Sequence, residues 1–385
     1  MADTVWMIDP TGATRGTIMW SSYTAVPKFN DVGTWQVNCP LTPQHALAAA
    51  AGWRVAIMAG TSTVIAGPVT KAEIKIDGTS GRATRRLVLS GEDDMRWMRG
   101  RDARPAPLAA LSAQTPAYDI RTGVASTIMR QYVDVNAGPG ALVARRVPSL
   151  TLAADPVAGP SITGRARFDK LLPLLQGLAV SGAVAGVTLG FRVNSGFGLG
   201  KVFQVYLPAD LTGPARFSMA LRNLKMLTWT LTAPTATHIV GGGRGEEDAR
   251  DFIEVADTAD ATAWGRLEDF YDFRAASDSD SNVELTQGAQ KRLDEQGHTQ
   301  LVEVVPVDTA RLQYGRDYGL GDVITVDVYG GVTVDEVVRE VEIKVDRAGG
   351  RKVTPRVGTV GATRSAASWI RLRDALARIS NLERR

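Results

Sequence analysis

The sequence contains very little cysteine and histidine. Its single cysteine, Cys39, excludes a disulfide bond within the chain. With only His45, His238 and His298 beside it, the chain lacks a cluster of thiolate and imidazole ligands for a structural zinc ion. No run approaches the roughly 18 consecutive apolar residues of a transmembrane helix, and the first residues lack the basic and then apolar order of a secretory signal. We therefore expect no metal, no cofactor, no membrane binding and no Sec export.

A block of charges of one sign is also missing. The 44 Lys and Arg residues and the 41 Asp and Glu residues give a net charge of +3, and the two signs are interspersed along most of the chain. Proteins that bind nucleic acids gather their basic residues into a patch or stripe, so we expect no sequence-specific nucleic-acid partner. With 44% apolar and 22% charged residues, the composition is that of a globular protein, and 385 residues allow two or three domains.

Complete catalytic or ligand-binding motifs are absent as well. Segment 194–201 lacks the glycine and the following Ser or Thr of a phosphate-binding loop. Segment 241–246 has glutamate where a dinucleotide-binding loop needs its last glycine, so we expect 241–245 to be a hinge. Segment 278–289 lacks the turn glycine and the bidentate glutamate of a calcium loop. These departures predict a protein without catalytic activity.

Short apolar or alternating runs, separated by turn residues, dominate what the sequence does contain. They predict strands at 17–20, 35–41, 54–58, 63–76, 85–90, 187–193, 201–207, 215–221, 227–232, 301–307, 322–329 and 332–346. Helical spacing of apolar residues predicts helices at 119–135, 168–179, 258–271 and 284–296. Proline and arginine crowd 99–116, where we place a domain boundary. The fold class is therefore predicted to be mainly β with α+β insertions.

The C-terminal segment has an amphipathic pattern of its own. Trp369, Leu372, Leu376 and Ile379 follow one another at spacings of three and four, which places them along one stripe of a helix. Two heptads are too few to identify a coiled coil. The stripe either packs on its own domain or forms an assembly contact, and we treat these four residues as a candidate interface.

Several segments together resemble the tail-hub, or minor tail protein, family of long-tailed siphoviruses that infect Actinobacteria. The resemblance covers about residues 20–345 and depends on the order of the pieces. The most specific piece is the turn Tyr318-Gly319-Leu320-Gly321-Asp322, which in such proteins precedes a barrel strand. The other pieces are Asp31-Val32-Gly33-Thr34-Trp35, Ser90-Gly91-Glu92-Asp93, Ala215-Arg216-Phe217-Ser218, Arg222-Asn223-Leu224, Gly243-Arg244-Gly245-Glu246, Trp264-Gly265-Arg266-Leu267-Glu268 and Tyr314-Gly315-Arg316-Asp317.

A physical interpretation of the turn does not need the family. Gly319 and Gly321 allow a tight reversal of the backbone, and Asp322 can accept hydrogen bonds from nearby amides. Tyr318 can cover the strand that follows the turn. We therefore interpret these residues as a structural barrel corner and expect no catalytic role for them.

The resemblance implies two similar β-barrel domains of the tail-tube and baseplate-hub type, and the spacing of apolar residues adds a C-terminal helix. The implied division is 1–100 for the first barrel, 101–183 for an α+β insertion, 184–235 for the first part of the second barrel, 236–299 for a helical or α+β insertion, 300–362 for the second part of the second barrel and 363–385 for the amphipathic helix. Segment 137–165 and the C-terminal helix have no counterpart in the resemblance.

The function that the resemblance implies is that of a structural virion protein in the phage tail tip, made in the host cytoplasm. Such a protein forms a homotrimer and joins the tail tube to the distal tip. The implied partners are a distal tail or tail-tube protein, the tape measure protein and downstream tip or receptor-binding proteins. A tail-associated cell-wall hydrolase and a receptor-binding tip protein remain as alternatives.

Overall fold

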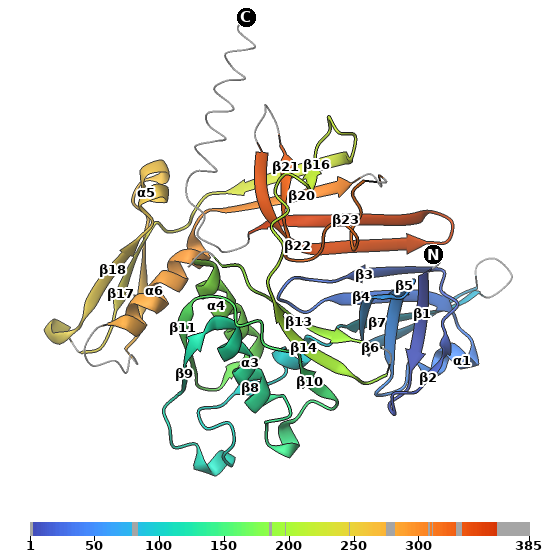
Figure 1. Ribbon diagram of the computed structural model, residues 1–385, viewed down its shortest axis with the longest axis horizontal. Coiled ribbons are helices and arrows are strands. Elements are labelled where there is room, and N and C mark those ends of the chain that lie inside the picture. Colours follow the sequence, from blue (N-terminus) through green and yellow to red (C-terminus); the bar gives the residue numbers. More distant parts are fainter. Residues whose placement is uncertain are drawn as a thin grey trace, which may run out of the picture. The chain divides into compact units, whose positions relative to one another are not determined.

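A computed structural model of the chain describes residues 3–78, 84–184, 187–196, 198–245, 247–274, 282–306, 309, 311–328 and 333–359. The chain divides into two compact units, each assembled from separate stretches of sequence. Unit 1 comprises Met1–Asp210, Gly319–Asp322 and Val338–Pro355, and unit 2 comprises Leu211–Tyr318, Val323–Val337 and the chain from Arg356 onward. β structure predominates over helix in the described residues (Figure 1).

Unit 1 is built around a large antiparallel sheet. Its strands are β1 (Asp3–Ile8), β2 (Thr14–Thr17), β3 (Ser22–Val26), β4 (Thr34–Pro40), β5 (Arg54–Ala59), β6 (Ser62–Asp77), β7 (Thr84–Glu92), the second half of β22 (Thr333–Asp346) and the first part of β23 (Gly350–Thr359). They pair in the order β23-β22-β3-β4-β7-β6-β5-β1-β2. In the described part of unit 1, β2 pairs only with β1, so the sheet is open there and no closed barrel is seen.

Alternation of side chains explains why β4 could be predicted. Trp35, Val37 and Cys39 are buried on one face, whereas Thr34 and Gln36 are exposed on the other. The prediction of a strand at 35–41 is thereby confirmed, as are those at 54–58, 63–76 and 85–90.

The predicted strand at 17–20 is wrong. The chain leaves β2 at Thr17 and enters β3 only at Ser22. The amide of Trp20 donates to the carbonyl of Ile18, which closes a local turn, and the Met19 side chain is 64% exposed. The prediction of a strand here was wrong because it used apolar composition alone.

A second layer of unit 1 combines helices with short strands. The helices are α2 (Arg96–Arg99), α3 (Ala125–Asn136) and α4 (Leu171–Val184), with 3-10 turns η1 (Leu111–Ala113) and η2 (Val143–Arg145). The short helix α1 (Pro43–Leu47) follows β4 and lies beside the large sheet, where His45 accepts a hydrogen bond from the amide of Met19. The strands are β8 (Asp102–Ala103), β9 (Asp119–Val124), β10 (Leu150–Leu152), β11 (Ser161–Ala166), β12 (Asp169–Lys170), β13 (Gly190–Ser195) and β14 (Lys201–Tyr206). The predicted helix at 168–179 and the strands predicted at 187–193 and 201–207 are confirmed as α4, β13 and β14.

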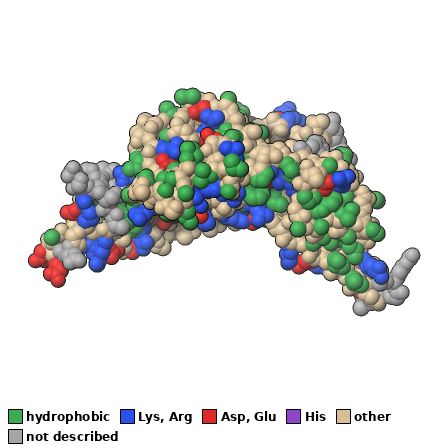
Figure 2. Space-filling model, turned by 90° about the horizontal axis from the view of Figure 1, so that it is seen from below, with side chains coloured by type: hydrophobic (Ala, Val, Ile, Leu, Met, Phe, Trp, Pro, Cys, Tyr) green, Lys and Arg blue, Asp and Glu red, His purple; other side chains and the backbone are tan. Residues whose placement is uncertain are grey.

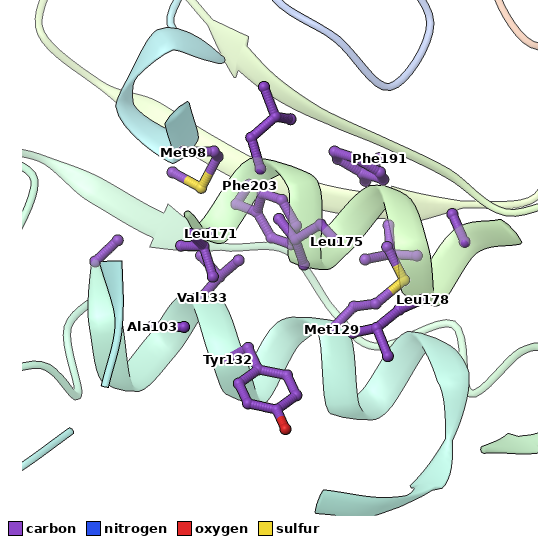
Figure 3. Close-up of a cluster of buried hydrophobic side chains, with 14 of the residues drawn as sticks. Met98, Ala103, Met129, Tyr132, Val133, Leu171, Leu175, Leu178, Phe191 and Phe203 are labelled. Carbon is purple, nitrogen blue, oxygen red and sulfur yellow. The ribbon is translucent and has the colours of Figure 1, made fainter. Parts of the chain in front are cut away.

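Helices α3 and α4 enclose the core of this layer. Figure 3 shows Met129 and Val133 of α3 next to Leu171 and Leu178 of α4. Phe203 of β14 is fully buried in the same cluster. Burying a side chain of this size contributes roughly 1.5–3 kcal/mol, so the cluster is the main reason why the layer holds together.

The predicted helix at 119–135 begins too early. Residues Asp119–Val124 form β9, which pairs with β11 in an antiparallel ladder, and the helix starts at Ala125. Gly123 has φ +156°, which is incompatible with a helix. Ile120 is 54% exposed, because its apolar side chain belongs to a strand at the surface and not to the buried helix stripe.

Unit 2 contains two sheets. Its elements are β15 (Arg216–Phe217), β16 (Leu224–Thr232), β17 (His238–Gly242), β18 (Phe252–Ala256), β19 (Glu268–Asp272), β20 (Thr299–Pro306), β21 (Val323–Asp327), the first part of β22, the last part of β23 (Gly350–Thr359), α5 (Thr258–Trp264), α6 (Val283–Gln296) and the 3-10 turn η3 (Glu247–Ala249). In one sheet β20 lies between β16 and β23, and β21 pairs with β22 and β15. The other sheet has the order β18-β17-β19, and α6 packs on one of its faces.

The strands predicted in unit 2 at 227–232, 301–307, 322–329 and 332–346, and the helix predicted at 284–296, are confirmed. Three other predictions are wrong. The predicted helix at 258–271 ends at Trp264, because Gly265 adopts φ +85°, and the chain continues as β19. The strand predicted at 215–221 is reduced to Arg216–Phe217.

The predicted hinge at 241–245 is wrong at its first two residues, since β17 extends through Gly242. A Cβ atom on Gly242 would lie 2.6 Å from Cζ of Phe270 and from a guanidinium nitrogen of Arg250. This glycine therefore provides room for two side chains that cross the sheet and does not make the chain flexible.

Candidate functional site

The turn at Tyr318–Asp322 lies where the chain changes from unit 2 to unit 1. On the unit 1 side, the Asp322 carboxylate accepts hydrogen bonds from the amides of Gly319 at 2.7 Å and Ala209 at 2.8 Å. Gly321 adopts φ +91°, and its amide donates to the carbonyl of Val338. Asp322 thus fixes the reversal by side-chain hydrogen bonds, as its residue type suggested. Gly319 is not in the left-handed region, so only Gly321 is needed for its backbone conformation.

The same turn packs tightly within unit 1. A Cβ atom on Gly321 would lie 2.7 Å from Cδ2 of Phe29. The hydroxyl of Tyr206 donates to the carbonyl of Leu320 at 3.1 Å, and burial raises the pKa of Tyr206 to about 12. The phenol is therefore a permanent hydrogen-bond donor that holds the turn against β14.

On the unit 2 side, Tyr318 is 4% exposed. Its ring meets the ring of Phe217 edge to face with 5.4 Å between the centroids, and it meets Tyr314 at 5.7 Å. Phe217 belongs to β15, which pairs with β21. Tyr318 therefore packs beside the strand that follows the turn, in a structural role.

Two further pieces of the family resemblance meet in unit 1 at what we call the glycine corner, formed by Gly33, Trp35, Gly91 and Asp93. Trp35 of β4 lies opposite Gly91 of β7 in the antiparallel ladder. The Gly33 amide donates to the Asp93 carboxylate at 2.9 Å. A Cβ atom on Gly91 would lie 2.5 Å from Cε2 of the Trp35 indole, so glycine is the residue that fits beneath this ring. Segments 31–35 and 90–93 are thus one structural site.

Asp93 is expected to make stability depend on pH. Burial raises the pKa of Asp93 to about 7 from an ordinary value of 3.8, although the amides of Gly33 and Met95 act in the opposite direction. The folded protein therefore binds a proton more tightly than the unfolded chain. The contribution of Asp93 to stability is complete below about pH 4 and decreases as the pH rises toward about 7.

The variant Asp93→Asn should remove this decrease, because asparagine does not ionise and still offers an oxygen to the Gly33 amide. Urea unfolding at pH 4.5 and 7.5 measures the effect. Asp102→Asn, a substitution of an exposed carboxylate, is the control and should keep the pH dependence of the natural chain. An unchanged slope in Asp93→Asn would show that Asp93 does not titrate in this range.

A buried ion pair lies next to the glycine corner. The guanidinium of Arg54 on β5 makes a bidentate contact with the Asp94 carboxylate, one bond at 2.8 Å, and both side chains are buried. Trp97 Nε1 donates to the same carboxylate at 3.1 Å, and the Ser195 hydroxyl on β13 also donates to it. Asp94 therefore connects the large sheet of unit 1 to its second layer.

The pieces at 215–218 and 222–224 likewise meet in unit 2. The Asn223 side chain accepts a hydrogen bond from the amide of Ser218 at 2.9 Å and donates to the carbonyl of Arg216 at 2.7 Å. The loop between β15 and β16 is closed by this one buried amide. Its role is to shape the loop.

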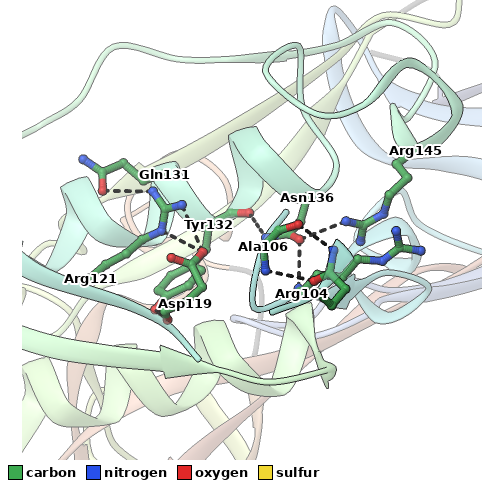
Figure 4. A network of polar contacts seen from close by, with 9 residues as sticks. Arg104, Ala106, Asp119, Arg121, Gln131, Tyr132, Asn136 and Arg145 are labelled. Atoms are coloured by element: carbon green, nitrogen blue, oxygen red, sulfur yellow. Dashed lines mark hydrogen bonds and ion pairs between the residues drawn. The ribbon is translucent and has the colours of Figure 1, made fainter. Parts of the chain in front are cut away.

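The α3 layer contains a polar network in which Tyr132 and Asn136 are buried (Figure 4). Arg121 of β9 pairs with Asp119 at 3.0 Å, and the Tyr132 hydroxyl donates to the carbonyl of Asp119 at 2.8 Å. Asn136 accepts hydrogen bonds from the Arg104 amide and the Arg145 guanidinium. Asn136 of α3 thus holds the backbone of the predicted boundary region at Arg104 and the side chain of Arg145 from the segment after α3.

The histidines have structural partners. His298 Nδ1 lies 2.8 Å from an oxygen of the buried Asp260 carboxylate, and His45 lies 2.8 Å from the carbonyl of Pro40. Among the residues that the structure describes, no group of three or more His, Cys, Asp or Glu could hold a metal ion. In the same residues, none of the helices has the length and apolar character needed to cross a membrane.

The four residues of the C-terminal stripe, Trp369, Leu372, Leu376 and Ile379, lie outside the described residues, and their assembly role stays a prediction. The surface shown in Figure 2 carries Lys and Arg side chains at many separate points, with acidic and apolar side chains between them. The interspersed charge of the sequence is thus visible on this face.

Sequence reasoning did not find Asp94 or Arg54. Forty residues separate the two, and Ser195 lies 101 residues beyond Asp94. The only local signal was the pair of adjacent carboxylates at 93 and 94, and adjacency does not indicate which partner each side chain meets.

Comparison with known proteins places this arrangement in context. A family model described as "Siphovirus ReqiPepy6 Gp37-like protein" matches residues 4–359. No curated protein matches. Solved structures with a similar fold include the 43 kDa tail protein of prophage MuSo2 from Shewanella oneidensis, with a TM-score of 0.57 and 12% identity over 92% of this chain and 98% of that one.

Two further tail proteins have a similar fold. The tail protein from Neisseria meningitidis MC58 has a TM-score of 0.53 and 13% identity over 94% of this chain and 98% of that one. The prophage tail protein gp18 from Listeria monocytogenes EGD-e has a TM-score of 0.50 and 10% identity over 97% and 99%. Because the family model covers nearly the whole described chain, this chain belongs to the siphovirus ReqiPepy6 Gp37-like family and is a component of the phage tail.

Proposed function

We propose that three copies of this chain form a ring at the distal end of the tail tube and join the tube to the tail tip. The ring is a mechanical adaptor without catalytic activity. Its neighbours are a distal tail or tail-tube protein and the tape measure protein on one side, and downstream tip or receptor-binding proteins on the other.

The observation that carries this proposal is that each of two compact units contains strands that pair mainly antiparallel, in a chain that belongs to a phage tail family. Two sheet modules per copy would give a threefold assembly six modules around its axis. A tube with sixfold symmetry would meet a similar surface at each module, and closed cyclic symmetry is the usual form of a soluble homo-oligomer.

The ends of the sheets support the same proposal. In the described residues, β2 ends the sheet of unit 1 and β16 ends the sheet of unit 2. Exposed edge strands promote uncontrolled pairing between chains, and closing the sheets into barrels or covering their edges with neighbours prevents it. We propose that each sheet closes into a barrel in the assembled ring.

Native mass spectrometry of the purified full chain tests the stoichiometry. We expect a complex of three times the 41.2 kDa chain mass. A monomer, or a complex whose mass is not a multiple of three chains, would contradict the proposed ring.

The C-terminal stripe is expected to contribute to assembly. The double variant Leu376→Asp, Ile379→Asp places two carboxylates on the stripe, and burying each without a partner costs several kcal/mol. We therefore expect the yield of assembled tails to fall at least about tenfold, the equivalent of 1.4 kcal/mol. The two units should stay folded, which circular dichroism can verify.

Ala367→Asp with Asn381→Asp is the matched control, since both positions lie opposite the stripe on a helical projection. This control should assemble normally. If the stripe variant assembles as well as the control, the stripe is not an assembly contact.

A further inference from the structure

We propose that the open face of the sheet β18-β17-β19 in unit 2 is the docking site for the C-terminal segment, residues 363–385, of a neighbouring copy in the ring. This inference rests on the trimer proposed above and specifies one of its contacts. It is carried by the apolar side chains of the face, its acidic surroundings, a hollow at one end, and the composition of the segment that follows β23.

The sheet has two faces with different surroundings. Ile239, Ile253 and Tyr271 point toward α6 and form a small core with Leu293. Because side chains alternate along a strand, Val240, Phe252 and Phe270 point to the opposite face. Phe252 is 59% exposed and Phe270 is 45% exposed. Two aromatic rings on one open sheet face are typical of a surface that contacts a partner.

Arg250 connects these two rings. Its guanidinium lies 5.6 Å from the centroid of Phe252 and 5.4 Å from that of Phe270. The Arg250 side chain also donates to the carbonyls of Gly242 and Gly243 and pairs with Asp272. The rings are therefore held in place before any partner arrives, which lowers the entropy cost of binding.

The region around the face is acidic, although the whole chain is slightly basic. Segment 247–272 contains nine Asp and Glu residues and two arginines. Asp260 is buried against His298 and Asp269 pairs with Arg292 of α6, so seven of the nine carboxylates surround the open face. Glu254 and Glu268 lie on the open face at its far end and share one arginine, Arg266. A basic partner would therefore be attracted to this face and positioned by its rim.

The face ends in a hollow. Its volume is about 400 Å³, and it is lined by Gly245, Glu247, Arg250, Phe252 and Arg274. One wall is the exposed Phe252 ring, and Glu247 supplies an acidic group. The hollow can accept a large aromatic side chain that brings a cation beside it.

The C-terminal segment has the complementary composition. Segment 363–385 contains six arginines and two acidic residues. Its predicted stripe carries one tryptophan and three aliphatic side chains, and arginines at 371, 373 and 378 lie off the stripe. The stripe would cover Phe252 and Phe270, and the arginines would meet the acidic rim. A helix on this face would match α6 on the other face of the same sheet.

A neighbouring copy is a consistent source of the segment. Each copy would offer one segment and one sheet face, so the segment of one copy would bind the face of the next. With three copies, these head-to-tail contacts form a closed ring. A contact of this kind strengthens the ring because one copy can leave only when two docked segments are released, its own and that of its neighbour.

Cross-linking in assembled tails that carry full-length chains tests the proposal. The pair Phe270→Cys, Leu376→Cys is treated with a short bismaleimide reagent. The natural Cys39 is 1% exposed and burial raises its pKa to about 11, so it stays unreactive. We expect covalent dimers and trimers on a denaturing gel. The control is the pair Leu221→Cys, Leu376→Cys, which should not cross-link. Leu221 is an exposed residue of unit 2 that lies outside the sheet β18-β17-β19.

Three results would overturn the inference. Linkage only within single chains would show that the segment docks on its own copy. Linkage to a different tail protein would identify another occupant for the segment. If the natural chain forms a complex of three copies but the cysteine pair gives no linkage in tails, the docking is rejected and the ring stands. If the natural chain does not form a complex of three copies, the proposed ring itself is rejected.

Discussion

Replacing Asp94 by alanine should lower the free energy of unfolding by about 3–5 kcal/mol. The carboxylate is 0% exposed and accepts hydrogen bonds from Arg54, Trp97 and Ser195. Removing it leaves the buried Arg54 guanidinium with an uncompensated charge. Most of the loss arises from that charge and not from the net energy of the pair, because burying both charges is itself costly.

Chemical denaturation measures this effect, and two variants control it. Asp102→Ala removes an exposed carboxylate paired with Lys170 and should cost less than about 1 kcal/mol. The double variant Arg54→Met, Asp94→Leu should lose less than Asp94→Ala, since it buries no unpaired charge. A loss below 1 kcal/mol in Asp94→Ala would mean that water or rearrangement satisfies Arg54.

Replacing Gly91 by alanine should cost about 3 kcal/mol, near the upper end for overpacking a core. The new methyl group would lie 2.5 Å from Cε2 of Trp35 and would also meet the carbonyl oxygen of Pro68. Trp35 is 3% exposed and the Pro68 oxygen is backbone, so neither can move freely.

Gly78→Ala is the matched control, because no atom of the described part of the chain lies within 4 Å of a Cβ atom at that position. It should change stability by less than about 0.5 kcal/mol. Thermal unfolding of both variants compares them directly. If Gly91→Ala is as stable as Gly78→Ala, the glycine corner is not tightly packed.

Part of the fold could be predicted from local pattern. β4 was predictable because Trp35, Val37 and Cys39 alternate with polar residues, which is the direct consequence of one buried face. α4 was predictable from its apolar length. By contrast, Ile120 and Ile128 fit one helical stripe in sequence, yet the first lies in β9 and the second in α3. Pairing with β11, about 40 residues later in the chain, decided the difference.

Most of the candidate site could not be predicted for the same reason, because contacts between distant parts of the chain bring its residues together. The glycine corner brings together residues 33 and 93, and the Asp94 cluster brings together residues 54, 94 and 195. In sequence these residues appeared only as separate pieces of the family resemblance or not at all, since spacing along a chain does not specify which strands become neighbours. The turn at Tyr318–Asp322 was predictable because Gly321 and Asp322 act within a few residues.

Cryo-electron microscopy of the intact phage tail, reconstructed without imposed symmetry, tests the central claim most directly. The account predicts that three copies of this chain surround the axis between the tube and the tip, with the sheets of units 1 and 2 alternating as six closed modules. A different number of copies, or a location away from the junction of tube and tip, would contradict it.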